Sequence, residues 1–289
     1  AHPETVSALG RWLRDNVMSL AKPLYDQGTS RLVMGLNKTG GLPTRNFQTS
    51  YFEGAAKSSG ETMRNTMLIG RHSCYACPVR CKRVVEVKGP AYQVSPEYGG
   101  PEYETIAALG SDCGIDDLPA IAKGSELCNA YGLDTISTGA TIAFAMECFE
   151  NGLLTKQDTG GLELRFGNAP AMVEMVEMIA NRRGFGNILA EGTARAAKKI
   201  GRGAEQFAIH VKGQELPMHE PRLKQGLGLG YALSPTGADH CHNLHDIYYT
   251  AKGPGLENFK ALGIMQPLPA SDLSPAKVRM LLYNSQWMW

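Results

Sequence analysis

Three cysteines within eight residues constrain this chain more than any other feature of its sequence. Cys74, Cys77 and Cys81 have the spacing C-x₂-C-x₃-C, with His72 before them and a basic, β-branched run after them. Thiols this close together are typical of ligands to one metal centre, because thiolate sulfur is a soft donor that suits iron–sulfur clusters, zinc or copper. The sequence therefore predicts a metal-binding loop.

The spacing favours a [4Fe-4S] cluster as the metal. Structural zinc usually takes two C-x₂-C pairs, or one pair and two histidines, and the chain has no second C-x₂-C. Three clustered thiolates and a distant fourth are the usual ligands of a cubane cluster. Zinc, or three unrelated thiols, are the alternatives. None of the other cysteines has a ligand-like neighbour, so we expect the fourth ligand beyond Trp289; Cys128 and Cys148 fit buried helix positions.

Composition and charge narrow the class of protein. A chain of 289 residues, 43% hydrophobic and 20% charged, is typical of a soluble globular protein of one large or two ordinary domains. A net charge of +1 with dispersed basic residues argues against nucleic-acid binding. There is no apolar run of the roughly 18 residues that a membrane span needs. An odd number of cysteines without a visible signal peptide predicts reduced thiols and a cytoplasmic location.

Apolar residues recur mostly at helical spacing, which predicts a mainly α fold. The expected helices cover residues 3–22, 24–36, 52–58, 102–109, 116–131, 134–149, 169–181, 187–200 and 274–289. Short strands are expected at 83–88 and 207–211. A hinge near 201–213 divides the chain into a helical domain at 1–208, which carries the cysteine loop, and the start of a second helical domain at 209–289. Because the chain begins without Met and ends on apolar residues, we expect a fragment of a longer protein.

Glu102 and Glu104 are candidate acid–base residues. Carboxylates at positions i and i+2 point to different sides of a helix, so at most one of them should face any given pocket. A buried carboxylate with a raised pKa can act as a general acid or base. The alternative is a pair of acids favoured at a helix start by the helix dipole.

Two further segments are candidates for ligand binding. Gly132 ends one expected helix and Asp134 caps the next, and the free N–H groups of such a helix start can bind a polar ring or a phosphate. An ordinary helix–turn–helix connection is the alternative. His240, His242 and His245 fall within six residues. They suit a metal site, an acid–base histidine or accidental clustering.

In their order along the chain, these segments resemble the tungsten-dependent aldehyde:ferredoxin oxidoreductase family. The resemblance is carried by the three cysteines of the loop and by the segments at 42–47, 100–105, 127–139, 212–217 and 237–240. It implies a mainly helical chain that corresponds to domains 2 and 3 of a three-domain parent, whose N-terminal pterin-binding domain is absent here.

The resemblance also implies a function. The parent would hold a tungsten (or molybdenum) bis-pterin beside a [4Fe-4S] cluster, oxidise a small aldehyde to a carboxylic acid and pass electrons to ferredoxin or another acceptor. The fragment alone is expected to be inactive. One alternative is the catalytic subunit of a tungsten-dependent aromatic acyl-CoA reductase, which has the same fold. Another is a non-catalytic helical module with a remnant metal-binding loop.

By position, the resemblance assigns roles to individual residues. It makes Cys74, Cys77 and Cys81 cluster ligands, and the fourth ligand would lie in a D-x-x-G-L-C segment that this sequence lacks. It makes Glu104 the carboxylate near tungsten, with Glu102 as second choice, and His240 the histidine that exchanges the substrate's proton.

The resemblance assigns the pterin contacts as well. The family's D-x-x-G-L-D segment corresponds to Asn129 through Gly132, Leu133 and Asp134, with Asn in place of the first Asp. Thr236 and His242 fall where the family has basic pterin-contacting residues. The E-x-x-H motif of the family's dimer-interface iron is absent, so that metal is not expected.

Overall fold

The computed structural model describes residues 2–288, and about half of the chain is helical. The α-helices are α1 (Pro3–Gln27), α2 (Leu32–Thr39), α3 (Gly60–Thr66), α4 (Tyr103–Leu109), α5 (Leu118–Tyr131), α6 (Thr135–Glu150), α7 (Ala169–Ala180), α8 (Gly186–Leu189), α9 (Thr193–Ile200), α10 (Gln225–Leu233), α11 (Pro254–Glu257) and α12 (Pro275–Met288). The strands are β1 (Leu68–His72), β2 (Lys82–Val85), β3 (Val87–Lys88), β4 (Gln93–Val94), β5 (His210–Val211) and β6 (Gln214–Glu215). They form three two-stranded antiparallel sheets, so the predicted mainly α fold is confirmed.

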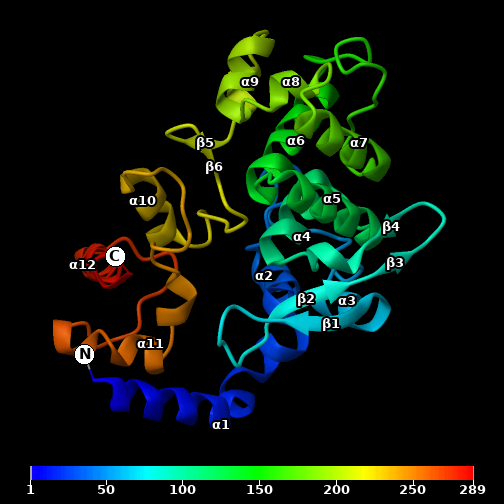
Figure 1. Cartoon of the computed structure of the whole chain (residues 1–289). Helices are drawn as coiled ribbons and strands as arrows, with labels where there is room; N and C mark the ends of the chain where they lie inside the picture. The colour runs from blue at the N-terminus through cyan, green and yellow to red at the C-terminus, as the bar shows by residue number, and fades with distance from the viewer. Residues whose placement is uncertain (1, 289) are drawn as a thin grey trace.

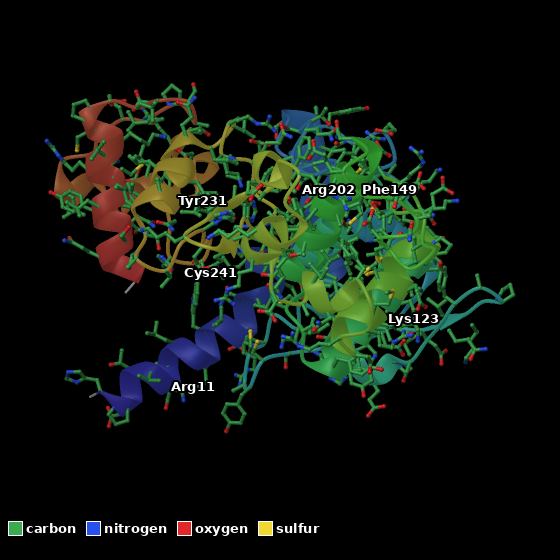
Figure 2. All side chains as sticks on the ribbon, turned by 90° about the horizontal axis from the view of Figure 1, so that it is seen from above. Arg11, Lys123, Phe149, Arg202, Tyr231 and Cys241 are labelled. Carbon is green, nitrogen blue, oxygen red and sulfur yellow. The ribbon has the colours of Figure 1, made fainter. Side chains whose placement is uncertain are left out.

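The elements gather into two unequal parts (Figure 1). Helices α4 to α9 and the hairpins β1–β2 and β3–β4 make the larger part, and α10 to α12 lie beside it. Helix α1 extends away from the body (Figure 2). None of the described helices combines the length and the hydropathy that crossing a membrane requires.

Helices α5 and α6 begin and end where capping chemistry predicts. Asp117 accepts the N–H of Ala120 at the start of α5, and Gly132 ends that helix with a φ of +69°. Asp134 then accepts the N–H of Ser137 at 2.8 Å and starts α6. Helix α6 packs on α4 so closely that a Cβ on Gly139 would lie 2.6 Å from the backbone of Ala108. The caps and this close contact fix the turn between α5 and α6 against α4.

The helix expected over 52–58 is wrong. That segment forms turns, because the side chain of Ser59 caps a later helix, α3, by accepting the N–H of Thr62 at 3.2 Å. Gly54 lies against Asp116, which a Cβ at that position would approach to 2.5 Å. The strand β1 was not predicted, and the strand expected at 207–211 is reduced to His210–Val211.

Two hydrophobic clusters form the core. The larger one runs from Val33 to Ala238, and the smaller one, from Leu244 to Leu281, joins α11 and α12. The domain boundary near residue 208 stays a prediction, since the larger cluster continues beyond it. Cys128 and Cys148 are buried in the larger cluster as expected, and burial raises the pKa of each thiol to about 12.

A buried ion pair holds the smaller part together. Lys277 of α12 lies 2.5 Å from Asp246, and both side chains are fully buried. The Asp246 carboxylate also accepts the N–H groups of Gly226 (3.1 Å) and Leu227 (2.9 Å) in the first turn of α10. One carboxylate therefore ties the start of α10 to α12.

We expect Lys277→Met to lower the free energy of unfolding by about 3–5 kcal/mol, because it leaves the Asp246 carboxylate buried and without its cation. Denaturant unfolding measures the change. Lys252→Met removes an exposed lysine and serves as the matched control. Equal stabilities of the two variants would contradict the assigned role of the pair.

A second buried carboxylate lies in the larger part. Asp112 is fully buried; its Oδ1 accepts the N–H of Phe47 at 3.0 Å, and its Oδ2 has no hydrogen-bond partner among the described residues. Burial, together with the neighbouring charges of Glu147 and Glu220, raises the pKa of Asp112 to about 8. The folded chain therefore keeps Asp112 protonated at neutral pH.

This protonation predicts a pH dependence of stability. The folded state binds the proton more tightly than the unfolded state, so the contribution of Asp112 to the free energy of unfolding falls as pH rises from about 4 to about 8. Asp112→Asn should flatten that slope, whereas the exposed Asp15→Asn should leave it unchanged. Denaturant unfolding at several pH values measures the slope, and equal slopes in wild type and Asp112→Asn would refute the prediction.

Candidate functional site

The three clustered cysteines lie in the loop that joins β1 to β2. The loop is turned by left-handed backbone at Ala76 (φ 56°) and Arg80 (φ 52°), and the N–H of Cys77 donates to the carbonyl of Cys74 at 3.0 Å. Cys74 is exposed, while Cys77 and Cys81 are half-buried, and none of them is in a disulfide. Three free thiols on one short, accessible loop form a donor set that fits a metal cluster.

The other two cysteines affect the electrostatics of Cys81, although the three thiols do not converge as a ligand group in the described part of the chain. Burial is the main cause that raises the pKa of Cys81, followed by the charge of Glu102 and by the charges of Cys77 and Cys74. A fourth thiolate does not come from Cys113, which is buried in the core with its pKa raised well above the ordinary value.

A buried arginine, Arg83, holds the backbone of the cysteine loop. Arg83 is 2% exposed and donates to three backbone carbonyls, those of Cys81 (3.0 Å), Arg80 (3.0 Å) and Asp26 (2.9 Å). Gly28 lies so close that a Cβ there would be 2.8 Å from the Cys81 carbonyl oxygen. The guanidinium thus joins the cysteine loop to the end of α1.

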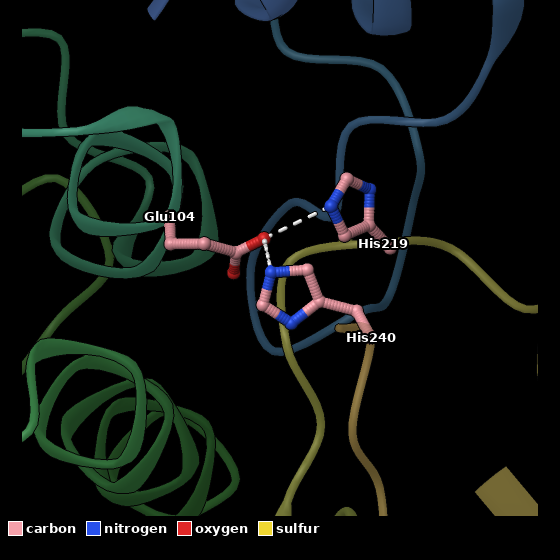
Figure 3. Close-up of side chains that lie close together, drawn as sticks. All are labelled: Glu104, His219 and His240. Carbon is pink, nitrogen blue, oxygen red and sulfur yellow. Dashed lines mark ion pairs between the residues drawn. The ribbon is translucent and has the colours of Figure 1, made fainter. Parts of the chain in front are cut away.

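Glu104, in the first turn of α4, meets two histidines from the far end of the chain (Figure 3). Its Oε2 accepts the N–H of Met218 at 2.7 Å. Its Oε1 lies 3.0 Å from Nε2 of His219 and 3.5 Å from Nε2 of His240, but neither is aligned as a hydrogen bond, and Oε1 keeps an open acceptor position among the described residues.

The charge state of Glu104 differs from our expectation. Burial acts to raise its pKa, but the contacts with His219 and His240 and the Met218 N–H outweigh burial, and the pKa of Glu104 is lowered. The group is therefore a carboxylate that can accept a proton, rather than an acid with a raised pKa.

The contact of Glu104 with His240, which the sequence did not predict, includes a further residue, His219. His219 is 6% exposed, and its ring lies 5.3 Å from that of Tyr103 and 5.0 Å from that of His240 between ring centres. Its Nδ1 is 2.7 Å from Nζ of the fully buried Lys224. No repeated pattern marks His219 in the sequence; its role follows from the fold, which returns residues 217–224 to α4.

Of the other clustered histidines, His245 lies beside this pair, with its ring centre 4.8 Å from that of His219 and 6.0 Å from that of His240, whereas His242 lines a different pocket. Burial lowers the pKa of His245 to about 3, and its Nε2 donates to the His240 carbonyl at 2.7 Å. His242 contacts Asp239 (2.8 Å) and lines an apolar pocket of about 310 Å³ between α10 and α12. Thr236 bonds to Ser234 beside it. Within the described part of the chain, the three clustered histidines thus do not converge on one metal site, and the pterin contacts of Thr236 and His242 stay predictions.

One pocket of about 410 Å³ is lined by Glu104, Asn129 and Asp134 among the predicted site residues, but not by the cysteines or His240. Its walls come from the base of the cysteine hairpin, the start of α4, and the turn between α5 and α6. The lining residues include His72, Lys82, Arg83, Glu102, Glu104, Asn129 and Asp134.

The two glutamates therefore share a pocket, and our expectation that at most one would face it is wrong. Glu102 precedes α4 in an extended conformation (φ −81°, ψ 172°), where it accepts the hydroxyl of Thr29, so helical spacing does not apply. Asp134 also lines a neighbouring pocket of about 300 Å³ with His240 and Cys241. The two pockets thus meet at the start of α6.

The turn from Asn129 to Asp134 forms as predicted. Asn129 donates to the Tyr98 carbonyl at 3.4 Å, and Gly132 adopts a left-handed conformation. Both carboxylate oxygens of Asp134 already cap α6, and Leu133 packs on the core. The polar groups of this turn that are not used in capping remain available to a ligand.

Comparison with known proteins gives a consistent family. A family model described as aldehyde ferredoxin oxidoreductase, domains 2 and 3, matches residues 5–288. A tungsten-containing aldehyde ferredoxin oxidoreductase of Thermococcus kodakarensis is 41% identical over 269 residues, which cover 93% of this chain and 41% of that protein. Its counterpart in Pyrococcus furiosus is 38% identical with the same coverage. The chain thus spans about two fifths of the length of these relatives.

More distant similarities follow. The WOR-like subunit of an aliphatic sulfonate oxidoreductase of Pyrococcus furiosus is 35% identical over 204 residues, 68% of this chain and 32% of that protein. The active-site complex BamBC of benzoyl coenzyme A reductase, solved with 1,5-dienoyl-CoA, superposes with a TM-score of 0.59 over 83% of this chain and 35% of that one. At 22% identity, this likeness shows the fold alone.

The support of the cysteine loop by Arg83 can be tested. Arg83→Gln removes most of the donors that hold the carbonyls of Arg80 and Cys81, so we expect the half-buried Cys81 to be alkylated faster by iodoacetamide, by about tenfold if about 1.4 kcal/mol of loop stability is lost. Peptide mass spectrometry measures the rate. The exposed Arg64→Gln is the control. Unchanged alkylation in Arg83→Gln would show that the loop does not depend on the guanidinium.

Proposed function

Because this chain belongs to the aldehyde ferredoxin oxidoreductase family, we propose that it forms the cluster-bearing and acid–base part of a tungstopterin oxidoreductase that converts a small aldehyde to a carboxylic acid. One observation carries the proposal. The pocket of about 410 Å³ has the base of the cysteine hairpin in one wall and the Glu104 carboxylate in another. A cofactor in this pocket would lie between an electron carrier and a proton acceptor.

We assign the cofactor contacts as follows. Cys74, Cys77 and Cys81 would hold three corners of a [4Fe-4S] cluster, with the fourth ligand from outside this chain. The pterin would contact the turn from Asn129 to Asp134. When bound, the metal–pterin group supplies oxygen-atom transfer and two-electron chemistry, and the cluster passes electrons on singly to ferredoxin or another acceptor.

Residues of this chain would accept and transfer the protons of the reaction. Oxidation of an aldehyde to an acid consumes one water and releases two electrons and two protons. Glu104 is a carboxylate whose buried Oε1 has no hydrogen-bond partner among the described residues, so it can take a proton. His240 is 3.5 Å from the same oxygen and lines the adjoining pocket, through which that proton can leave.

Two alternatives from the sequence remain testable. Reduction of an aromatic acyl-CoA is favoured less, because the relatives that match nearly the whole chain at 38–41% identity are aldehyde oxidoreductases by name. A non-catalytic module would hold zinc or no metal. The elemental content of the full-length protein separates these possibilities, since the enzyme needs tungsten or molybdenum together with iron.

The role of Glu104 predicts the effect of its substitution. In the full-length protein, Glu104→Gln should lower kcat for aldehyde oxidation by about 10²-fold or more, because the amide cannot accept the proton. Tungsten and iron contents should stay at wild-type values. Glu97→Gln replaces an exposed glutamate near the same pocket and is the matched control.

Two results would contradict the proposal. Wild-type turnover in Glu104→Gln would remove the carboxylate from the mechanism. One zinc per chain, with neither tungsten, molybdenum nor iron, would remove the oxidoreductase function itself.

A further inference from the structure

Lys224 is a buried cation whose presence beside the candidate site needs an explanation. Its side chain is fully buried, and among the described residues its ammonium has one hydrogen-bond partner, Nδ1 of His219 at 2.7 Å. Burying an ammonium without a carboxylate in contact is costly. Burial lowers the pKa of Lys224 to about 8, while the charges of Glu104 and Asp246 oppose that shift, so the group stays mainly charged at pH 7.

This contact decides which nitrogen of His219 carries the proton. An ammonium has three donors and no acceptor, so Nδ1 must accept the hydrogen bond from Lys224. The pKa of His219 is lowered, chiefly by burial, which favours the neutral ring. A neutral imidazole with Nδ1 as acceptor carries its proton on Nε2, the nitrogen that lies 3.0 Å from Oε1 of Glu104.

We infer that Lys224 is a positioning residue that holds His219 in the Nε2–H tautomer, so that His219 presents a proton to Glu104 and not a lone pair. The N–H dipole beside Oε1 favours the ionised carboxylate. His240, which is more exposed than His219, is then the histidine that is free to exchange protons with the pocket. The catalytic consequence rests on the proposed function, but the tautomer itself does not.

The same tautomer keeps a divalent cation out of the site. One atom each of Glu104, His219 and His240 lie within 4.8 Å of one another, a donor set of one carboxylate and two imidazoles that suits zinc or iron. A nitrogen that carries a proton has no lone pair for a metal. Lys224 thus makes a site that has the composition of a metal centre serve as a carboxylate beside an N–H group.

Two substitutions of Lys224 distinguish an effect on the His219 tautomer from an effect on side-chain packing. Lys224→Arg keeps a side chain that only donates, and it should preserve the tautomer. Lys224→Gln offers both a donor and an acceptor, and it should allow both tautomers. Lys260→Gln alters an exposed lysine and is the matched control. Thermal unfolding of each variant confirms that it is folded.

Nitrogen-15 NMR of the histidine-labelled chain at pH 7 reads the tautomer directly, without any cofactor. We expect His219 to be protonated at Nε2 in the wild type, in Lys224→Arg and in Lys260→Gln, and to be a mixture in Lys224→Gln. Protonation of wild-type His219 at Nδ1 would overturn the inference. That measurement needs no substitution, so it stands even if a variant fails to fold.

Cobalt(II) titration, followed by its visible absorption, tests the exclusion of metal. We expect Lys224→Gln to bind Co²⁺ at least tenfold more tightly than the wild type, and His240→Ala in the same background to abolish the gain. Equal binding by wild type and Lys224→Gln would overturn the exclusion. In the full-length enzyme, Lys224→Gln should lower kcat and shift its pH profile, and Lys224→Arg should restore both. A wild-type pH profile in Lys224→Gln, with the tautomer altered as expected, would count against the proposed function and leave the tautomer assignment intact.

Discussion

The burial of one carboxylate organises both the fold and the candidate site. Glu104 is held at the start of α4 by the N–H of Met218, and the neighbouring Tyr103 donates its hydroxyl to the carbonyl of the same residue. A buried charge is stable only when donors surround it, and here the donors come from a segment more than a hundred residues away. The chain cannot bury Glu104 without also placing His219 and His240 beside it, so the geometry of the site follows from the folding of residues 217–240 onto α4.

The parts of the structure that follow local rules could be predicted from the sequence. The caps around Gly132 and Asp134 follow from local rules. The resemblance named Glu104 and His240 separately and did not predict that they contact each other. His219 was not predicted, because its importance arises from a long-range contact that leaves no local pattern. The shared pocket of the two glutamates was missed for a similar reason: whether Glu102 is helical depends on Thr29, a distant partner.

Electrons and protons would be handled by parts of the chain with separate supports. The cysteine loop is joined to the end of α1 by Arg83, which donates to backbone carbonyls of both. Glu104 depends on α4, which packs on α6 inside that cluster. The pocket beside Glu104 is lined by the base of the cysteine hairpin, at His72 and Lys82, and by none of the three cysteines.

This separation also explains the unequal burial of polar groups in the chain. Near Glu104, the side chains of Lys224 and His219 are buried. Burial strengthens each electrostatic contact and fixes protons on particular atoms. At the cysteine loop the thiols are exposed or half-buried, which would suit the proposed cluster and its electron transfer to an outside acceptor. Burial is thus greatest around the proposed proton acceptor and least at the proposed cluster ligands. The buried pair of Lys224 and His219 thus serves the proposed proton transfer. A metal ion bound beside Glu104 would instead cancel the charge of the carboxylate on which the proposed chemistry depends.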